Sequence, residues 1–458
     1  MMTDSSFETT NGSEAPVPLE VAETAATTEA SDPQAYQQPV PSEGKERIST
    51  ASPQRFGVTY RVAFLFASMV AGISSVSIKQ LLLPIQVGLL DPKNTNTSFA
   101  AVAAIGALAG LLAAPLTGAL ADRTTSRWGR RRPWIVLGTL VGAVGLLIMA
   151  WSTTIPRLIL GEILEQIGVD AVLSNVTALI PDQIPEHSRA NTSALNGMAP
   201  IVGGVLGLVL VTNFTNPHIV SQGYFLLTCS TLLCVGVFLL VLRERPLLRS
   251  QVAPFRWRAF VASFLHPLHT PDFTWTLLSR LLVFLCYTLL GSYLLFYMRA
   301  VLHASVPVAG RGITTYQLIS TTVVILAALL AGYLSQRFNR LKPFVCIGAL
   351  VMALSVFAIV LFPTWSALYT AAALFGTGFG LYLGIDIALA VRVLPNAQSR
   401  SKDLGVMYTP IFLPLIVTPL LGASILNSFA NNFSLLFTTA AIASLLAAGC
   451  ILPIRSVK

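Results

Sequence analysis

Charged side chains are scarce in this sequence. Asp, Glu, Lys and Arg make up 11% of its 458 residues, whereas a soluble domain carries about 25%. Hydrophobic residues supply 54% of the chain, and the mean hydropathy is +0.71. This composition excludes an ordinary soluble protein and predicts an all-α integral membrane protein that crosses the bilayer many times.

Acidic residues are scarcer still beyond the amino-terminal segment. Nine of the twenty lie between Asp4 and Glu46, which leaves eleven for the rest of the chain. The apolar body is therefore basic. Its Lys and Arg residues stand between apolar runs, where the orientation of membrane spans accounts for them, so nucleic acid is not expected as a partner.

Motifs for metal, disulfide and nucleotide chemistry are also missing. The five cysteines stand singly inside apolar runs, and the sequence contains no CxxC, HExxH or GxxxxGK[ST]. Neither a disulfide framework, a metal site nor a phosphate-binding loop is expected. No nucleophile is paired with a base, so we expect neither an enzyme nor a resident cofactor.

Residues 1–56 differ in composition from the rest of the chain. They are rich in Ser, Thr, Ala, Glu and Pro and have few large apolar side chains. This pattern predicts a disordered, acidic, cytoplasmic tail. The segment lacks an apolar stretch with a cleavage site, so it does not resemble a secretory signal.

The rest of the sequence contains twelve apolar runs of spanning length. They lie near residues 60–87, 99–121, 134–151, 158–180, 194–212, 223–242, 276–298, 313–334, 344–362, 366–391, 405–427 and 433–453. Small residues within them predict close helix contacts, at Gly118 and at the pairs Gly106 with Gly110 and Gly203 with Gly207.

Lys and Arg residues in the connections predict the orientation of the spans. With the amino terminus in the cytoplasm, nineteen of them fall on the cytoplasmic side and four on the other. Both termini are therefore expected in the cytoplasm. The longest internal connection separates six spans from six, which predicts an amino-terminal bundle (57–242), a linker (243–273), a carboxyl-terminal bundle (274–454) and a short cytoplasmic end (455–458).

Two charged connections resemble each other. The stretch GALADRTTSRWGRRRPW begins at Gly118, and GYLSQRFNRLKPF begins at Gly332. The interval between these two glycines is the same as the interval between Pro181 and Pro395. Two matches at one spacing predict that the halves are repeats of each other.

The first of these stretches resembles the signature loop of the major facilitator superfamily. Its long form, together with PDFTWTLLSRLLVFLCY and LPNAQSRSKDLGVMY, is similar to the sugar–cation symporters of the glycoside–pentoside–hexuronide and sucrose type. The resemblance implies two pseudo-symmetric six-helix bundles, a central substrate site and alternating access. It further implies a cytoplasmic gate, to which we assign Gly118, Asp122, Arg123, Arg127, Gly129, Arg130, Arg131, Arg189, Gly332, Arg337 and Arg340. The second copy has Gln336 in place of the aspartate and should form a weaker latch.

Ionisable groups within a span are costly and are by default functional candidates. The fourth span carries Glu162, Glu165, Gln166 and Asp170. At 100° per residue Glu162, Gln166 and Asp170 share one face, and Glu165 lies to its other side. A carboxyl group at that depth can take up a proton when water is scarce and release it when water enters. We therefore choose Asp170 first, then Glu165 and Glu162, as proton or cation coupling candidates; pairing for packing alone is the alternative.

Other polar residues in the spans are candidates for the substrate cavity. Lys79 could meet the acids of the fourth span or extend toward the membrane surface, and Asp386 could serve substrate binding or gating. Arg280 is expected to reach the cytoplasmic surface or to join the gate. The complete set of cavity candidates is Lys79, Gln80, Gln86, Gln166, Asn175, Tyr287, Tyr293 and Asp386.

The second span, from Phe99 to Leu120, contains no acid. The sodium-dependent glycoside symporters that the chain resembles place aspartates there, so a proton is the better expectation for the coupling ion. The sequence thus predicts a monomeric secondary transporter of the cell membrane that takes up a sugar or glycoside with a proton. Efflux of an amphipathic drug or metabolite, and a non-transporting sensor or assembly protein on the same fold, remain alternatives.

Overall fold

The computed structural model describes residues 58–216, 218–244, 271–338, 340–393 and 409–454. Among these residues twelve helices are long and apolar enough to cross a membrane. The twelve expected spans are therefore confirmed, and most of them begin and end within a few residues of the predicted limits. The tail 1–56, most of the linker and residues 455–458 lie outside the described residues.

The first six spans pack on one another. The first span is a composite, in which two π-helical stretches separate α-helical ends, and α5 packs against α3 and α4. The elements are α1 (Val58–Ala71), η1 (Gly72–Val76), η2 (Ile78–Leu82), α2 (Leu83–Leu90), α3 (Thr95–Ala121), α4 (Arg132–Ala150), α5 (Ile155–Gln183), α6 (Glu186–Val211) and α7 (Val220–Val241).

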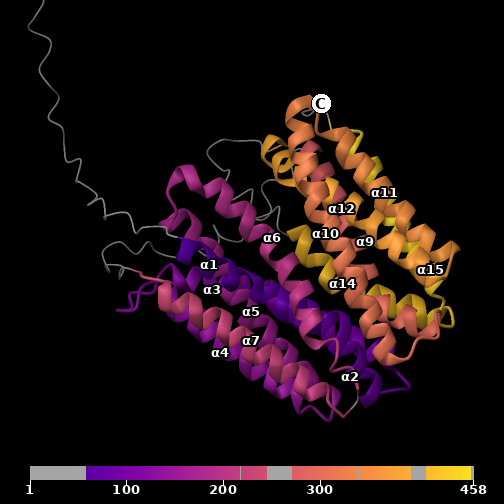
Figure 1. Ribbon diagram of the computed structural model, residues 1–458, viewed down its shortest axis with the longest axis horizontal. Helices are drawn as coiled ribbons and strands as arrows, with labels where there is room; N and C mark the ends of the chain where they lie inside the picture. Colours follow the sequence, from indigo (N-terminus) through magenta and orange to yellow (C-terminus); the bar gives the residue numbers. More distant parts are fainter. Residues whose placement is uncertain (1–57, 217, 245–270, 339, 394–408, 455–458) are drawn as a thin grey trace, which may run out of the picture. The chain divides into compact units, whose positions relative to one another are not determined.

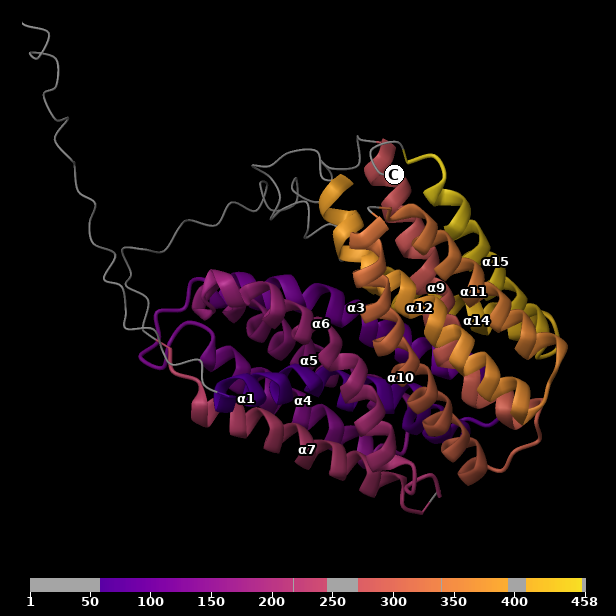
Figure 2. The ribbon, with the colours of Figure 1, turned by 45° about the horizontal axis from the view of Figure 1, so that its top comes forward.

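The last six spans repeat this arrangement. In them α12 packs against α10 and α11, as α5 does against α3 and α4. The elements are α9 (Pro271–Ala300), α10 (Val306–Phe338), α11 (Lys342–Leu361), α12 (Trp365–Val393), α14 (Thr409–Ser428) and α15 (Phe433–Ile451). The indigo to magenta helices and the orange to yellow helices form two groups in Figure 1, and the turned view of Figure 2 keeps them apart.

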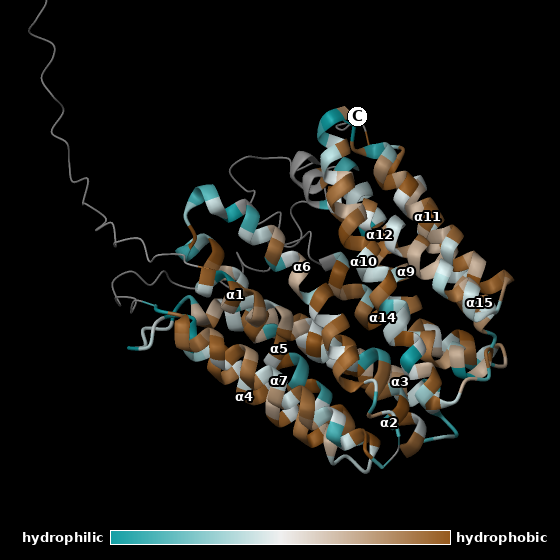
Figure 3. Ribbon diagram, viewed as in Figure 1, coloured by the Kyte–Doolittle hydropathy of each residue, from teal (hydrophilic) through white to brown (hydrophobic). Residues whose placement is uncertain are grey.

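The outward faces of the helices are apolar. Leu240, Leu233, Leu326 and Leu361 each expose well over half of their surface. Brown ribbon runs along the helices in Figure 3, whereas teal gathers at helix ends and connections. Exposure of so much hydrocarbon to water would be unfavourable, whereas contact with lipid tails is not. These faces are therefore suited to contact with a lipid bilayer.

Glycines set the closest helix crossings in both halves. A Cβ atom added at Gly138 of α4 would lie 2.9 Å from the carbonyl oxygen of Gly168 in α5, and one at Gly348 of α11 would lie 2.7 Å from that of Gly378 in α12. The spacing in the sequence is the same within both pairs. Two equivalent crossings therefore relate the halves position by position.

The crossings correct the alignment of the two repeats. The interval from Gly138 to Gly348 equals the interval from the start of α4 to the start of α11, and also that from the start of α5 to the start of α12. It is slightly shorter than the interval from Gly118 to Gly332 that the loops indicated. The shorter interval applies to α4 with α5 and to α11 with α12, and it makes Val176 the counterpart of Asp386.

The two halves touch at the end of the spans predicted to be extracellular, called here the outer end. The Asn96 Nδ2 atom donates to the side-chain oxygens of Asn431 (2.8 Å) and Asn427 (3.3 Å). One turn deeper, the Phe99 ring packs edge-on against Tyr293 and Phe296, with centroids 5.7 and 5.3 Å away. Amides and aromatic rings therefore join α3 to α9 and to the end of α14.

The glycine crossing predicts the effect of a single added methyl group. In Gly168→Ala the new Cβ atom would overlap Gly138 and Gly142 of α4, so we expect a loss of about 1 to 3 kcal/mol in stability. The matched control is Gly236→Ala in α7, where a Cβ atom meets nothing within 4 Å. That variant should be neutral or slightly stabilised. Thermal unfolding of the purified variants measures both, and equal melting temperatures would contradict the crossing.

Candidate functional site

The acids of the fourth span lie in α5 and are buried. Glu162 and Glu165 have no exposed surface, and Gln166 and Asp170 each expose 5%. We call Glu162, Glu165, Gln166 and Asp170 the acidic stripe. The carboxyl groups are thus turned away from the apolar outer faces of the helices, as their cost in hydrocarbon requires.

Two glycines of α3 make room for the acidic stripe. A Cβ atom at Gly106 would collide with the side chain of Glu162, and one at Gly110 would collide with Asp170 and Gln166. The close contact predicted for this glycine pair is therefore observed, and its partners are polar side chains rather than another backbone. The helix that lacks acids supplies the space in which the acids of α5 fit.

Lys79 enters the acidic stripe from the first span. Its Nζ atom donates to Gln166 Oε1 at 2.7 Å and lies 3.9 Å from Glu162 Oε1. The amide of Gln166 in turn donates from Nε2 to Asp170 Oδ2 at 2.9 Å. The extension of Lys79 toward the membrane surface is thus wrong, and its meeting with the acids of the fourth span is confirmed.

The π-helical stretches of the first span carry the residues that face α5, Ser75 of η1 and Lys79 of η2. Gln80 also belongs to η2. π-Helical turns are rare and often occur at functional sites. Gln80 points the other way from Lys79, toward the second half: its Nε2 atom lies 3.2 Å from where a Cβ atom of Gly291 in α9 would be.

Glu165 lies on a different side of α5, as the helical periodicity predicts. Its Oε1 atom accepts a 3.4 Å hydrogen bond from Ser75 Oγ. A small cavity beside it is lined by Ser74, Gly142 and Thr231 among others. Glu165 therefore faces the interior of the amino-terminal half.

The second half holds a different charged group. Arg280 Nη2 lies 2.9 Å from Asp386 Oδ2, and Tyr382 donates to Asp386 Oδ1 at 2.9 Å. Arg280 exposes only 6% of its surface, so its predicted extension to the cytoplasmic surface is wrong. A buried arginine of this kind is held by its partner, because an unpaired charge at that depth would cost several kcal/mol.

An aromatic surface lies beside this ion pair. The Tyr287 ring of α9 stacks on Phe379 of α12 with centroids 4.6 Å apart and planes 12° from parallel, and Phe375 continues the stack. Phe284 packs edge-on against Phe379. Tyr287 is half-buried, so it keeps some surface for a ligand.

Three cavity candidates serve packing instead. Gln86 donates to the Met149 carbonyl oxygen at 2.7 Å, Asn175 donates to that of Ala171 at 2.8 Å, and Tyr293 donates to that of Pro419 at 2.6 Å. All three are buried, with 6%, 0% and 0% exposure. Their assignment to a substrate cavity is not supported, because their donors already bond to backbone oxygens.

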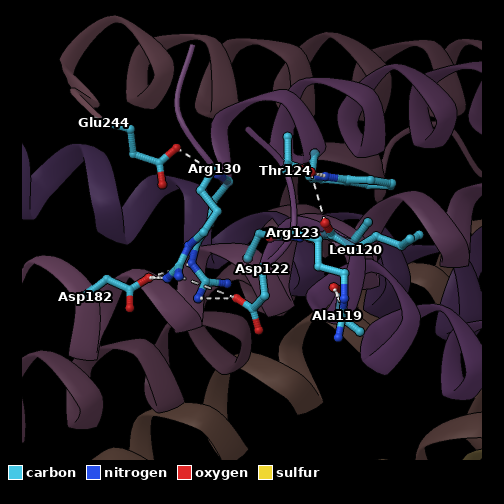
Figure 4. Close-up of polar contacts among 12 residues, drawn as sticks. Ala119, Leu120, Asp122, Arg123, Thr124, Arg130, Asp182 and Glu244 are labelled. Carbon is cyan, nitrogen blue, oxygen red and sulfur yellow. Dashed lines mark hydrogen bonds and ion pairs between the residues drawn. The ribbon is translucent and has the colours of Figure 1, made fainter. Parts of the chain in front are cut away.

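The gate candidates Asp122, Arg130 and Arg131 do meet, and Figure 4 shows the cluster. Arg131 joins two acids, with Nη2 3.1 Å from Asp122 Oδ1 and Nε 2.7 Å from Asp182 Oδ2. Arg130 also bonds Asp182. These four side chains, with Glu244 added, are called here the gate cluster.

Glu244 holds the loop of the gate cluster in place. Its Oε2 atom accepts hydrogen bonds from the backbone N–H groups of Arg131 and Arg132, both at 2.8 Å. A carboxylate at the start of α4 also interacts favourably with the helix dipole. Gly129 has a φ of +104°, and a Cβ atom there would collide with Glu244, so glycine is required on both grounds.

In the part of the chain that the structure describes, Arg127, Arg337 and Arg340 do not contact the gate cluster. All three side chains are exposed. A Cβ atom added at Gly118 or Gly332 would meet nothing within 4 Å. The close helix contact expected at Gly118 is therefore wrong. Arg123 bonds to the Ala119 carbonyl oxygen. Arg189 donates to the backbone oxygens of Ile184 and Pro181. These bonds join neighbouring parts of the chain, and they do not extend the gate as predicted.

Three residues of these groups escaped the sequence analysis. Asp182 lies in the last turn of α5, beyond the limit predicted for the fourth span, and opposite the arginine-rich loop. Glu244 is the first acid after the sixth span. Tyr382 precedes Asp386 by four residues, a spacing that places both on one helix face and could have identified the pair.

Helices of spanning length in two similar groups of six, with ionisable groups buried between them, define a membrane transporter rather than an enzyme. The profile of the Major Facilitator Superfamily matches residues 62–325 and 277–458. The chain belongs to this superfamily.

Relatives and solved structures agree with this assignment. The chain is 30% identical to a general alpha-glucoside permease of Schizosaccharomyces pombe over 23% of this chain and 22% of the relative. It is 32% identical to a sucrose transport protein of Arabidopsis thaliana over 34% of each, and 30% identical to a glucose transporter of Staphylococcus epidermidis over 35% of each. The matched parts thus span 22% to 35% of the length of these relatives.

Among solved structures, a D-xylose-proton symporter superposes with a TM-score of 0.67 at 18% identity, over 86% of this chain and 97% of that one. A nucleoside transporter gives the same TM-score at 15% identity, over 86% and 99%. At such identities the likeness shows the fold alone.

Arg131 is expected to stabilise the gate cluster more than its neighbours do. Arg131→Gln removes the ionic contacts with Asp122 and Asp182 and should lower the free energy of unfolding by about 1 to 2 kcal/mol, discounted because the Asp122 side chain is 55% exposed. Arg127→Gln, in the same loop but exposed, is the control and should have no effect. If both variants unfold at the same temperature, the cluster contributes nothing to stability.

Proposed function

We propose that the protein is a proton-coupled sugar symporter that works by alternating access. The observation that carries this proposal is the acidic stripe, whose buried carboxyl groups meet Lys79 on one side and α3 on the other. A buried carboxyl group that can exchange a proton with water gives a transporter a way to couple a proton gradient to a conformational change.

The contacts of Lys79 favour a proton over sodium. Its ammonium group lies 3.9 Å from Glu162 and bonds to Gln166, and so occupies the place where a bound metal cation would sit. Sodium would have to displace this charge or bind beside it. A proton adds to one carboxyl oxygen and needs no such space.

The choice of a sugar rests on the relatives and on two features of the structure. The named relatives transport glucosides, sucrose and glucose. Between the halves, Gln80 offers an amide for hydroxyl groups, and Tyr287 offers an aromatic face of the kind on which the apolar face of a sugar ring stacks. We place the substrate between the halves, beside Gln80 of the first span and Tyr287 of α9.

In this proposal the protein lies in the cell membrane as a monomer with both termini in the cytoplasm. The structure then corresponds to a state closed at the outer end, because Asn96, Asn427 and Asn431 bridge the halves there. The gate cluster lies at the cytoplasmic end, where Asp122, Arg131 and Asp182 would make or lose contacts as the halves rock.

The variant Asp170→Asn tests whether sugar can still cross the membrane when its movement is no longer coupled to a proton. In proteoliposomes carrying an inward proton gradient of one pH unit, the wild type should accumulate a glucoside up to about tenfold per coupled proton, since one unit equals about 1.4 kcal/mol. The variant keeps the hydrogen-bonding shape but cannot carry the proton, and should only equilibrate the sugar. Asp91→Asn, an acid in the outer loop, is the control and should accumulate sugar like the wild type.

The uptake assay also tests the alternatives. If the wild type moves no member of a panel of glucosides, disaccharides and hexoses, the choice of sugar is wrong, and amphipathic efflux substrates become the next candidates. If the wild type and Asp170→Asn accumulate sugar equally, Asp170 is not the coupling group.

A reversible link at the outer end tests alternating access. A short thiol-reactive cross-linker joining Asn96→Cys to Asn431→Cys should abolish transport, because the halves could no longer separate there. Cleavage of the linker should restore transport. Each single cysteine variant, treated in the same way, is the control, and continued transport by the cross-linked protein would contradict the proposed movement.

A further inference from the structure

Three carboxyl groups and one ammonium group share the interior of the amino-terminal half. Glu162, Glu165 and Asp170 expose 0%, 0% and 5% of their surface. Among the residues that the structure describes, Lys79 is the base with recorded contacts to the acidic stripe, through Glu162 and Gln166. If all three acids were ionised, this region would carry a net charge of minus two in a medium that solvates charge poorly.

Hydrogen bonds do not compensate such a charge. Within the described part of the chain, no donor bonds to either carboxyl oxygen of Glu162 or to Oε2 of Glu165. The Oε1 atom of Glu165 accepts one hydrogen bond, at 3.4 Å. A buried carboxylate without donors is unstable, and the usual outcome is that it takes up a proton. Asp170 differs, because Gln166 donates to it at 2.9 Å.

Within the described ranges, the helices around the acidic stripe bring no second positive charge to it. The facing groups are Gly106 and Gly110 of α3, the glycines of α4, the hydroxyl groups of Ser74 and Ser75 of η1, and the hydroxyl groups of Tyr224 and Thr231 of α7. These groups are neutral near physiological pH. Lys79 therefore determines how much negative charge the region can hold.

We propose that Lys79 is the counter-charge of the acidic stripe and fixes its proton content, so that in this state one carboxyl group is ionised and the other two are protonated. The inference rests on the proposed proton coupling and makes it more specific. The amide of Gln166 extends the influence of the ammonium group, because it accepts from Lys79 and donates to Asp170. The single negative charge is thus shared between Glu162, at 3.9 Å from Lys79, and Asp170, which Lys79 reaches through that amide. Lys79 is a positioning residue, since it acts through these acids.

Infrared spectroscopy of the purified protein near neutral pH measures the proton content directly, because a protonated carboxyl group has its own C=O stretching band. The contribution of the acidic stripe is the band lost when Glu162→Gln, Glu165→Gln and Asp170→Asn are combined in the same background. The variant Lys79→Gln lacks the positive charge, so the third acid should also be protonated. We therefore expect the band contribution to rise 1.5-fold, from two protonated groups to three. Lys79→Arg keeps the charge and should match the wild type, as should Lys93→Gln, which alters an exposed lysine of the outer loop.

A pair of variants covers the case in which Lys79→Gln does not fold. Glu162→Gln alone removes one acid and leaves Lys79, so its band contribution should fall to half that of the wild type. The double variant Lys79→Gln, Glu162→Gln removes one charge of each sign and should return the contribution to the wild-type value. Equal contributions from these two variants, or an unchanged band in Lys79→Gln, would overturn the proposal.

The experiment uses neither sugar nor a proton gradient. Failure of the proposed transport activity therefore leaves the band intensities unaffected, and the two results can be told apart. Conversely, a protein that accumulates sugar with protons but shows no effect of Lys79 on the band would keep the proposed function and lose this inference.

Discussion

The burial of three carboxyl groups in one helix is the constraint on which the amino-terminal half depends. Helix α5 can carry them only if its neighbours offer space and compensation. Gly106 and Gly110 of α3 supply the space, and Lys79 supplies the positive charge. A change in any of these elements would leave an acid either crowded or uncompensated, so the π-helical first span, α3 and α5 form one structural unit.

The two halves have the same helix arrangement but different chemistry. Glycine crossings at equal sequence spacing recur in both, at Gly138 with Gly168 and at Gly348 with Gly378. In the second half, Asp386 has Arg280 as a direct partner at 2.9 Å, so this group is neutral as a pair. The first half thus holds three buried acids with one base beside them, and the second holds an ion pair beside an aromatic surface. Such a division suits a carrier in which one half responds to the ion and the other contacts the cargo.

The sequence predicted the helices well because spanning length and hydropathy are local properties. It also placed Glu162, Gln166 and Asp170 on one face, since helical periodicity determines that arrangement. It failed where the answer depends on a distant partner. Arg280 was expected at the cytoplasmic surface or in the gate because it lies near the end of the span, but the carboxylate of Asp386, on another helix, holds it inside. Asn175 and Tyr293 bear the same groups as a substrate-binding residue, and only the structure shows that backbone oxygens already accept their hydrogen bonds.

The amide contacts at the outer end have a consequence for the environment in which the protein can work. Asn96, Asn427 and Asn431 carry no net charge, so dissolved ions hardly screen their hydrogen bonds, whereas the charged gate cluster at the opposite end is sensitive to ionic strength. In the proposed orientation, the uncharged closure faces the fluid whose salt content a cell does not control. The gate cluster, whose recorded contacts lie within the amino-terminal half, faces the cytoplasm, whose salt content the cell keeps constant. The amide contacts between the halves would therefore have the same strength in dilute and in saline surroundings.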